Sequence, residues 1–248
     1  AKNEISYLNN FKRFHLNMWV AQESAFIRAS DWDACNLEPI TEDKFSGMQC
    51  VGALDLASTR DFTAFVLIFK DDDILHILPY FWIPRMTLTD RKNADQIMAW
   101  VNEGFITATD GNITDYNFIQ SKITELSGKF NITEIAYDPW NSTQIVTNLT
   151  DEGANMVEFR QGFVSMSPAT KEMEKLVLQK KLNHGGNPVL AWMINNMTLR
   201  TDPAGNIKPD KEKSSDKIDG AVASVMGISR AVFSWVEQTT SIYESDEC

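Results

Sequence analysis

The chain has 248 residues, of which 43% are hydrophobic and 23% charged, so it can bury one large core of ordinary composition. Its formal net charge of −11 argues against a large nucleic-acid-binding face, which normally carries an excess of Lys and Arg. No apolar run approaches the roughly 20 residues that span a bilayer, and the first residues show no secretory pattern. The three cysteines include no Cys-x-x-Cys pair, so neither a disulfide framework nor a thiolate zinc site is predicted.

The first 44 residues differ from the rest of the chain. Apolar residues recur at helical spacing between Tyr7 and Arg28, and the segment from Ser30 to Cys35 then breaks the pattern. This stretch is too short for a domain. We therefore expect an arm or linker over 1–44 that packs on a main domain over 45–235, followed by an acidic tail over 236–248.

From residue 48 the chain alternates between strand and helix signals. Three strands come first, at 49–56, 62–70 and 73–83. The later strands are predicted at 132–137 and 157–160, with extended segments at 189–195 and 197–200. Helices are predicted at 91–103, 115–128, 142–150, 169–182 with Pro168 in the first position, and 216–232. This order predicts an α/β domain, with a mixed β-sheet flanked by helices on both faces.

Three acids fall where such a sheet would bring them together. Asp55 ends the first strand, Asp138 follows a buried parallel strand, and Asp219 lies on an apolar face of the last helix. Because all their ligand atoms are oxygen, they suit Mg²⁺ or Mn²⁺ better than Zn²⁺. Two such ions, about 3.5–4 Å apart, can activate a water and stabilise the leaving oxygen in phosphodiester cleavage.

Each of these acids also has a structural interpretation. Asp55 could be a strand-end acid bonded to a turn, and Asp138-Pro139 is a common turn pair. Asp216 could cap the last helix, which is the role we expect for it. The residue pattern by itself leaves metal-dependent nuclease chemistry and a purely structural role both open.

Several segments in order carry a family resemblance. They include Gly-Ala-Leu-Asp-Leu-Ala-Ser-Thr-Arg-Asp from Gly52 and Ala-Tyr-Asp-Pro-Trp-Asn from Ala136. The full set spans Phe14–Trp19, Gly52–Ala64, Ala136–Asn141, Arg160–Pro168, Leu182–Leu190 and Lys217–Ala223. With these segments the chain resembles the nuclease domain of a tailed-bacteriophage terminase large subunit.

The resemblance implies a ribonuclease H-like fold and a two-metal endonuclease that cuts concatemeric viral DNA during genome packaging. Asp55, Asp138 and Asp219 would form the metal-binding triad for two Mg²⁺ or Mn²⁺ ions, with Asp55 bridging them. Asp216 matches a position that is often acidic in the family, and it is a candidate to assist. Asp61 matches a recurrent acid, which we expect to support the ligands from a turn rather than to bind metal directly.

The resemblance also implies partners. Full large terminases begin with an ATPase domain, and no phosphate-loop motif occurs in this chain, so it looks like a C-terminal portion. The implied partners are double-stranded DNA, that ATPase domain, the small terminase subunit and the portal protein, in the host cytoplasm and with no membrane.

Two sets of basic residues have competing interpretations. His184 precedes Gly185-Gly186, where we expect it to cap a helix end rather than to act as a base. Seven lysines could contact the DNA backbone or could simply be solvated: Lys171, Lys175, Lys180, Lys181, Lys208, Lys211 and Lys213.

Three other classes of protein compete with this interpretation. An actin-like ATPase or sugar kinase also places an acid after its first strand, but it needs a second domain and Gly-rich adenosine loops. A transposase or resolvase shares the chemistry but lacks the Asp-Pro-Trp segment. A non-catalytic portal or capsid docking module would not need three acids on three separate elements.

Overall fold

The computed structural model describes residues 26–56, 60–140 and 142–244. Most of the helix predicted between Tyr7 and Arg28 lies outside these ranges, as does the end of the acidic tail. None of the helices within the described ranges is both long enough and apolar enough to cross a membrane.

A mixed β-sheet forms the centre of the molecule, in the order β4-β3-β2-β1-β5-β6, with β7 also paired to β3. The neighbours of β1 differ in direction, because β2 runs antiparallel to it and β5 runs parallel. The seven strands are β1 (Gln49–Asp55), β2 (Thr63–Asp71), β3 (Ile74–Pro84), β4 (Thr107–Thr109), β5 (Asn131–Tyr137), β6 (Met156–Glu158) and β7 (Leu182–Asn183).

The first three strands agree with the sequence prediction to within one residue at each end. Their hydrophobic runs are long, and the hairpin between β2 and β3 turns through Asp72, which has a φ of 51°. Asp residues tolerate this left-handed conformation better than most others, so a turn is favoured at this point.

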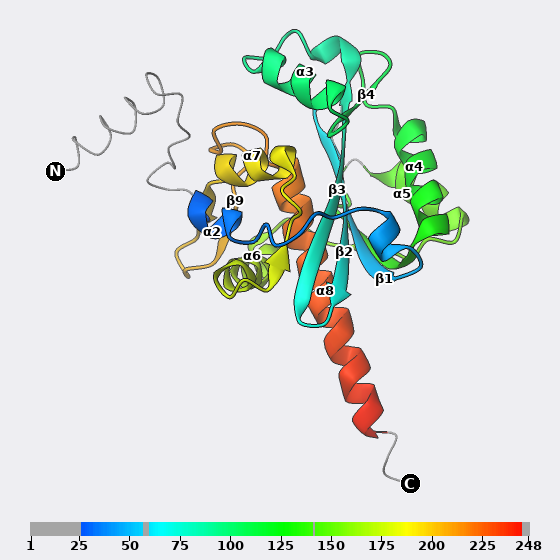
Figure 1. Ribbon diagram of the computed structural model, residues 1–248, viewed down its shortest axis with the longest axis vertical. Helices are drawn as coiled ribbons and strands as arrows, with labels where there is room; N and C mark the ends of the chain where they lie inside the picture. The colour runs from blue at the N-terminus through cyan, green and yellow to red at the C-terminus, as the bar shows by residue number, and fades with distance from the viewer. Residues whose placement is uncertain (1–25, 57–59, 141, 245–248) are drawn as a thin grey trace, which may run out of the picture.

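Helices cover both faces of the sheet, as predicted (Figure 1). On one face lie α4 (Tyr116–Lys129) and α5 (Thr143–Asp151). On the other lie α6 (Phe163–Leu178), α7 (Pro188–Asn196) and α8 (Asp219–Glu244). Two separate hydrophobic clusters result, one on each face. A further helix, α3 (Ala94–Asn102), lies beyond the end of β3, and a small hairpin of β8 (Leu199–Thr201) and β9 (Ile207–Pro209) joins α7 to α8.

The described part of the predicted arm packs closely on this domain. It holds a short helix, α2 (Ala29–Asp33), and a single 3₁₀ turn, η1 (Asp43–Phe45). Trp32 and Cys35 are fully buried against the α6 side of the sheet, and Phe45 is buried on the opposite side. The segment therefore contributes to both hydrophobic clusters.

One predicted segment was wrong. The stretch 189–195 was expected to be extended but forms α7, because Asn187 caps it by accepting hydrogen bonds from Val189 and Leu190 and Pro188 takes the first position. A short, continuously apolar run fits either a buried strand or a buried helix, so its hydrophobicity could not decide between them.

The starts of two helices were also misplaced. The helix α6 begins at Phe163 and runs through Pro168, although proline cannot donate a helical hydrogen bond and its ring crowds the preceding turn. The last helix begins at Asp219 rather than near Asp216, so Asp216 does not cap it. Instead, Asp216 accepts a bond from the next backbone amide, that of Lys217.

Glycines let α8 lie directly against the sheet. A Cβ atom placed on Gly220 would come within 2.5 Å of the Phe81 ring, and one on Gly227 would lie 2.9 Å from Ile68. Because Gly220 follows Asp219, this close approach holds the start of α8 against the central strands.

Candidate functional site

Asp55 occupies the end of β1 and points toward α8. Along β1, Val51 and Ala53 belong to the cluster on the α8 face, so the alternation of side chains places Asp55 on that face as well. The residue is only 3% exposed. Burial of this kind is costly for a carboxylate that lacks charged or hydrogen-bonding partners.

Asp55 has two polar partners from distant parts of the chain. Lys211, which follows the β8–β9 hairpin, places its Nζ 2.6 Å from Asp55 Oδ2. Gln161, which follows β6, donates from Nε2 to Asp55 Oδ1 over 3.0 Å. The same lysine ammonium lies 3.5 Å from Oδ1 of Asp219, so it joins two acids that are 164 residues apart in the sequence.

The Asp219 carboxyl is in an unusual electrostatic position. It is almost completely buried, and burial raises its pKa to about 7, although the nearby Lys211 acts in the opposite direction. Its Oδ2 is buried and has no hydrogen-bond partner among the described residues. Partial burial opposes a charge on Lys211, but Asp55 and Asp219 together raise the pKa of its ammonium above the usual range.

Asp138 lies at the end of the neighbouring strand. Leu54 of β1 pairs with Tyr137 of β5, so the next residues, Asp55 and Asp138, leave the sheet side by side. The Asp138 carboxylate accepts a hydrogen bond from the backbone amide of Trp140 over 3.0 Å. Within the described ranges, no three side chains of His, Cys, Asp or Glu are grouped closely enough to hold a metal ion. The structure thus brings together Asp55 and Asp219, with Asp138 beside them but turned toward its own loop.

Asp61 and Asp216 both have other partners. Asp61 is paired with Lys217 and with Arg91, whose Nη2 lies 3.2 Å away. Burial works against its charge, but Lys217 and the Phe62 amide hold the pKa of Asp61 below its usual value. Asp216 accepts a bond of 3.4 Å from Asn93. The supporting role expected for Asp61 and the assisting role considered for Asp216 both stay predictions.

His184 does not lie at a helix end, so the predicted cap was wrong. It follows β7, and its ring stacks on Trp32 with a centroid distance of 4.3 Å. Its Nδ1 accepts a hydrogen bond from Gly186, which leaves Nε2 to donate to the Trp32 carbonyl. Both ring nitrogens are therefore used to fix the N-terminal segment onto the domain.

A small open cavity of about 190 Å³ adjoins the two buried acids. Its lining carries both positive and negative side chains: Gln161, Met166, Arg200, Lys208, Pro209, Asp210, Lys211, Glu212 and Val222. Lys208 donates to the Gln161 carbonyl over 3.0 Å. Of the seven predicted DNA-contacting lysines, Lys208 and Lys211 lie at this cavity, and their contact with DNA stays a prediction.

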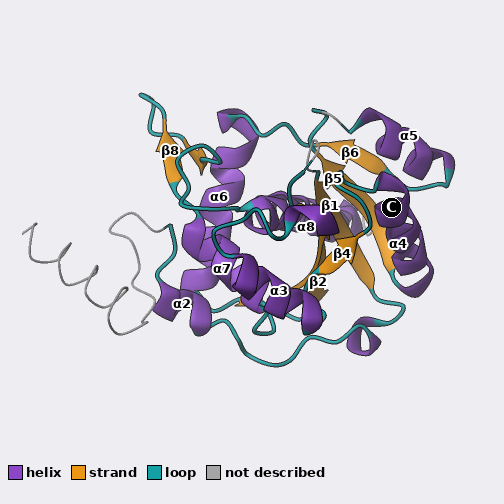
Figure 2. Cartoon of the chain, turned by 90° about the horizontal axis from the view of Figure 1, so that it is seen from above, coloured by secondary structure: helices purple, strands orange, loops and turns teal. Residues whose placement is uncertain are grey.

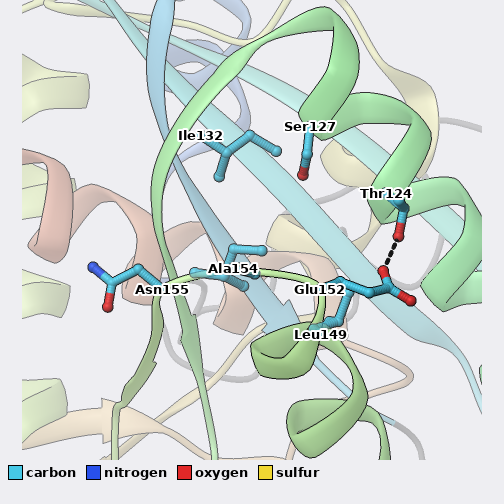
Figure 3. Close-up of a pocket in the computed structure, with 9 residues that line it drawn as sticks. Thr124, Ser127, Ile132, Leu149, Glu152, Ala154 and Asn155 are labelled. Carbon is cyan, nitrogen blue, oxygen red and sulfur yellow. Dashed lines mark hydrogen bonds between the residues drawn. The ribbon is translucent and has the colours of Figure 1, made fainter.

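A second pocket lies between α4, α5 and the edge of β5, with a volume of about 120 Å³ (Figure 3). Glu152 crosses it to accept a hydrogen bond from Thr124. None of the three predicted metal ligands lines this pocket, so it is separate from the candidate site.

Sequence reasoning did not identify Gln161 at all, and it assigned Lys211 only to possible DNA contact. Gln161 had one signal, since it follows the third of three parallel strands, where polar residues gather at the sheet edge. For Lys211 no local signal exists, because it reaches Asp55 only through the fold of the hairpin.

Comparison of the sequence with known protein families identifies the family of this chain. Residues 1–234 match the family described as terminase large subunit, endonuclease domain. This chain belongs to that family. It is 36% identical to the terminase large subunit of Enterobacteria phage HK97, over 91% of this chain and 45% of that protein. It is also 33% identical to protein YmfN of Escherichia coli K12, over 97% of this chain and 56% of that protein.

One solved structure supports the family membership, and a more distant one shares the fold. The crystal structure of the HK97 large terminase has a TM-score of 0.76 and 35% identity, over 91% of this chain and 47% of that one. The large terminase nuclease of the thermophilic phage G20c, solved with bound magnesium, has a TM-score of 0.56 at 10% identity, over 84% of this chain and 98% of that one. These matches confirm the predicted ribonuclease H-like fold. The chain spans about half the length of the curated relatives it matches.

Proposed function

We propose that this chain is a metal-dependent DNA endonuclease domain that cuts concatemeric viral DNA during genome packaging. The observation that carries the proposal is the pair of buried acids at the sheet edge. Asp55 and Asp219 share the single ammonium of Lys211, and Asp219 Oδ2 has no hydrogen-bond partner among the described residues. A buried carboxylate oxygen without a partner is unfavourable, and a bound cation would compensate for it.

The donor set fits two divalent ions of the Mg²⁺ or Mn²⁺ type. The ligands would be the oxygens of Asp55, Asp138 and Asp219. Asp55 is the best placed to be shared, because its strand pairs with the strand before Asp138 and its carboxylate shares Lys211 with Asp219. Oxygen-only ligands suit these hard cations. The G20c nuclease, which shares the fold, has been solved with magnesium and with cobalt, in agreement with divalent cations at such a site.

The residues of the chain prepare the site for this chemistry. Gln161 fixes one oxygen of Asp55, and Lys211 shows that a positive charge is favoured between Asp55 and Asp219. Asp61 forms ion pairs with Lys217 and Arg91, so its proposed role is to support the loop after β1. Bound divalent cations would supply an activated water and would stabilise the negative charge on the leaving oxygen of the phosphodiester.

The implied partners follow from the family. Double-stranded DNA is the proposed substrate, and the ATPase domain, the small terminase subunit and the portal protein are the proposed partners of the longer protein in the host cytoplasm. Since the chain is acidic overall, we infer that its own affinity for DNA is weak and that those partners hold the substrate.

Plasmid digestion with Mg²⁺ or Mn²⁺ tests the proposal. Wild type should convert supercoiled DNA to open and linear forms, and Asp55→Asn, Asp138→Asn and Asp219→Asn should each fail to do so. A matched control is Asp115→Asn, which makes the same change at the cap of α4, where asparagine also serves well. Equal cutting by all five proteins, or no cutting by any of them, would refute the nuclease assignment.

A further inference from the structure

Trp140 is a large aromatic residue left in solvent beside a predicted metal ligand. It is 80% exposed, whereas Trp32, Trp82, Trp100 and Trp192 are all at most 6% exposed. Tryptophan is highly buried on average, and its ring offers a flat apolar face, so an exposed one beside a candidate site is a candidate for ligand contact. Its backbone amide donates to the Asp138 carboxylate over 3.0 Å, which ties the position of the indole to that acid.

The strand order places Trp140 at the same sheet edge as the candidate site. Three parallel strands, β1, β5 and β6, end at the same edge of the sheet, and β5 is the central one (Figure 2). Asp55 ends the strand on one side. Gln161, which bonds to Asp55, follows the strand on the other side. Trp140 therefore leaves the sheet between the two segments that form the buried acid site.

Exposed positive charge surrounds the same edge. The Arg160 side chain is 79% exposed, and its counter-charge among the described residues, Glu158, is 3.8 Å away. Lys208 lies over the Phe163 ring at 5.3 Å, and the Lys211 side chain is 41% exposed. Cations of this kind hold phosphates, and an aromatic face among them can pack on a base.

On the basis of the proposed nuclease function, we propose that Trp140 is a DNA-positioning residue that inserts its indole at the base step beside the cut phosphate. An apolar wedge between base pairs unstacks them and bends the duplex at that point. The contact fixes which phosphate lies over Asp55 and Asp138. It also favours cutting at pyrimidine–purine steps such as TA and CA, which unstack most easily.

The test uses short duplexes with 2-aminopurine next to one candidate step, and it compares wild type with Trp140→Ala and Trp140→Phe. A matched control is Phe118→Ala, an exposed aromatic residue on α4 at the other face of the sheet. Binding is measured with EDTA present, so that no cleavage is required, and cutting is measured with Mg²⁺. The melting temperature of each variant checks that it folds, as expected for a change at an exposed site.

Trp140→Ala should weaken duplex binding by about 5- to 100-fold and abolish the rise in 2-aminopurine fluorescence on binding. It should also remove the preference for TA and CA steps over GC steps. Trp140→Phe should restore most of each effect, and Phe118→Ala should match wild type. If Trp140→Ala binds the duplex, unstacks its bases and cuts it like wild type, the DNA-positioning role of Trp140 is refuted, while the proposed nuclease function is not. If wild type cuts no DNA, the nuclease function is refuted. The binding and fluorescence results still decide whether Trp140 inserts between base pairs.

Discussion

Two buried polar clusters in this chain satisfy their hydrogen bonds very differently. Around His184, the ring nitrogens bond to Gly186 and to the Trp32 carbonyl, and Asn183 bonds to the backbone of Leu37 and Glu38. Around Asp55 and Asp219, two acids share one ammonium and a carboxylate oxygen has no described partner. In the first cluster the His184 and Asn183 side chains find their partners within the protein, although the Trp32 indole nitrogen has none among the described residues. In the second, under the proposed function, a bound cation would complete the set of partners. Substitutions in the two clusters should therefore act on different quantities.

The largest effect is expected for Asp219→Asn. Cutting should fall by at least about 100-fold, because losing a direct metal ligand should cost more than losing a residue that merely supports one. Without divalent cations, the variant should lose little stability, because Lys211 keeps its bond to Asp55 and the amide removes the cost of burying a carboxylate. Thermal melting with and without Mg²⁺ checks this, and only wild type should melt at a higher temperature with the ion. A variant that loses both stability and activity would show that Asp219 is structural.

Trp32→Ala should have the opposite signature. Removing a fully buried indole costs about 3–5 kcal/mol of unfolding free energy, and here it also removes the stacking partner of His184. Chemical denaturation measures the loss, and Trp32→Phe should show a smaller one. The cutting rate per folded molecule should stay unchanged, because Trp32 does not contact Asp55 or Asp219. A large loss of cutting rate with normal stability would contradict this prediction, because it would show that the His184 cluster contributes to cleavage.

Gly220→Ala should affect both quantities, because it lies between the core and the site. The added methyl group would clash with the Phe81 ring and Met193, so unfolding should become easier by about 1–3 kcal/mol. The start of α8 should shift, and cutting should fall with it. The matched control is Gly128→Ala in α4, where nothing lies within 4 Å, and this change should stabilise the protein by about 0.5–1 kcal/mol. If both variants are stabilised, α8 does not depend on close packing.

The smallest effect is expected in the pH dependence of the His184 cluster. Burial lowers the pKa of His184, so below about pH 6.5 the unfolded chain binds more protons at this residue than the folded protein does. Stability should therefore fall as the pH drops through 6.5. His184→Asn, which cannot be protonated in this range, should show a shallower fall between pH 7.5 and 5.5. The difference between the two proteins should not exceed about 1.4 kcal/mol per pH unit, and an equal slope in both would contradict the assignment.

The sequence by itself determined the sheet, the two helical faces and the acids at the strand ends. A long apolar run predicts one type of secondary structure, and a residue such as Asp72 favours the left-handed backbone conformation of a turn. Both signals come from residues that are close in the sequence. Two other helices were predicted less well. The short, apolar α7 was predicted as extended, and α6 was predicted to begin at Pro168 rather than at Phe163. Their conformation depends on neighbours distant in sequence.

Only the tertiary structure could place Lys211 and Gln161 on Asp55, and it also gave His184 a role in anchoring the N-terminal segment. These contacts join residues more than 100 positions apart, and no pattern within a window of sequence encodes them. The close approach of α8, permitted by Gly220, sets the distance between Asp219 and Asp55. Residue types thus fixed which chemistry was available, and long-range packing decided which side chains meet to perform it.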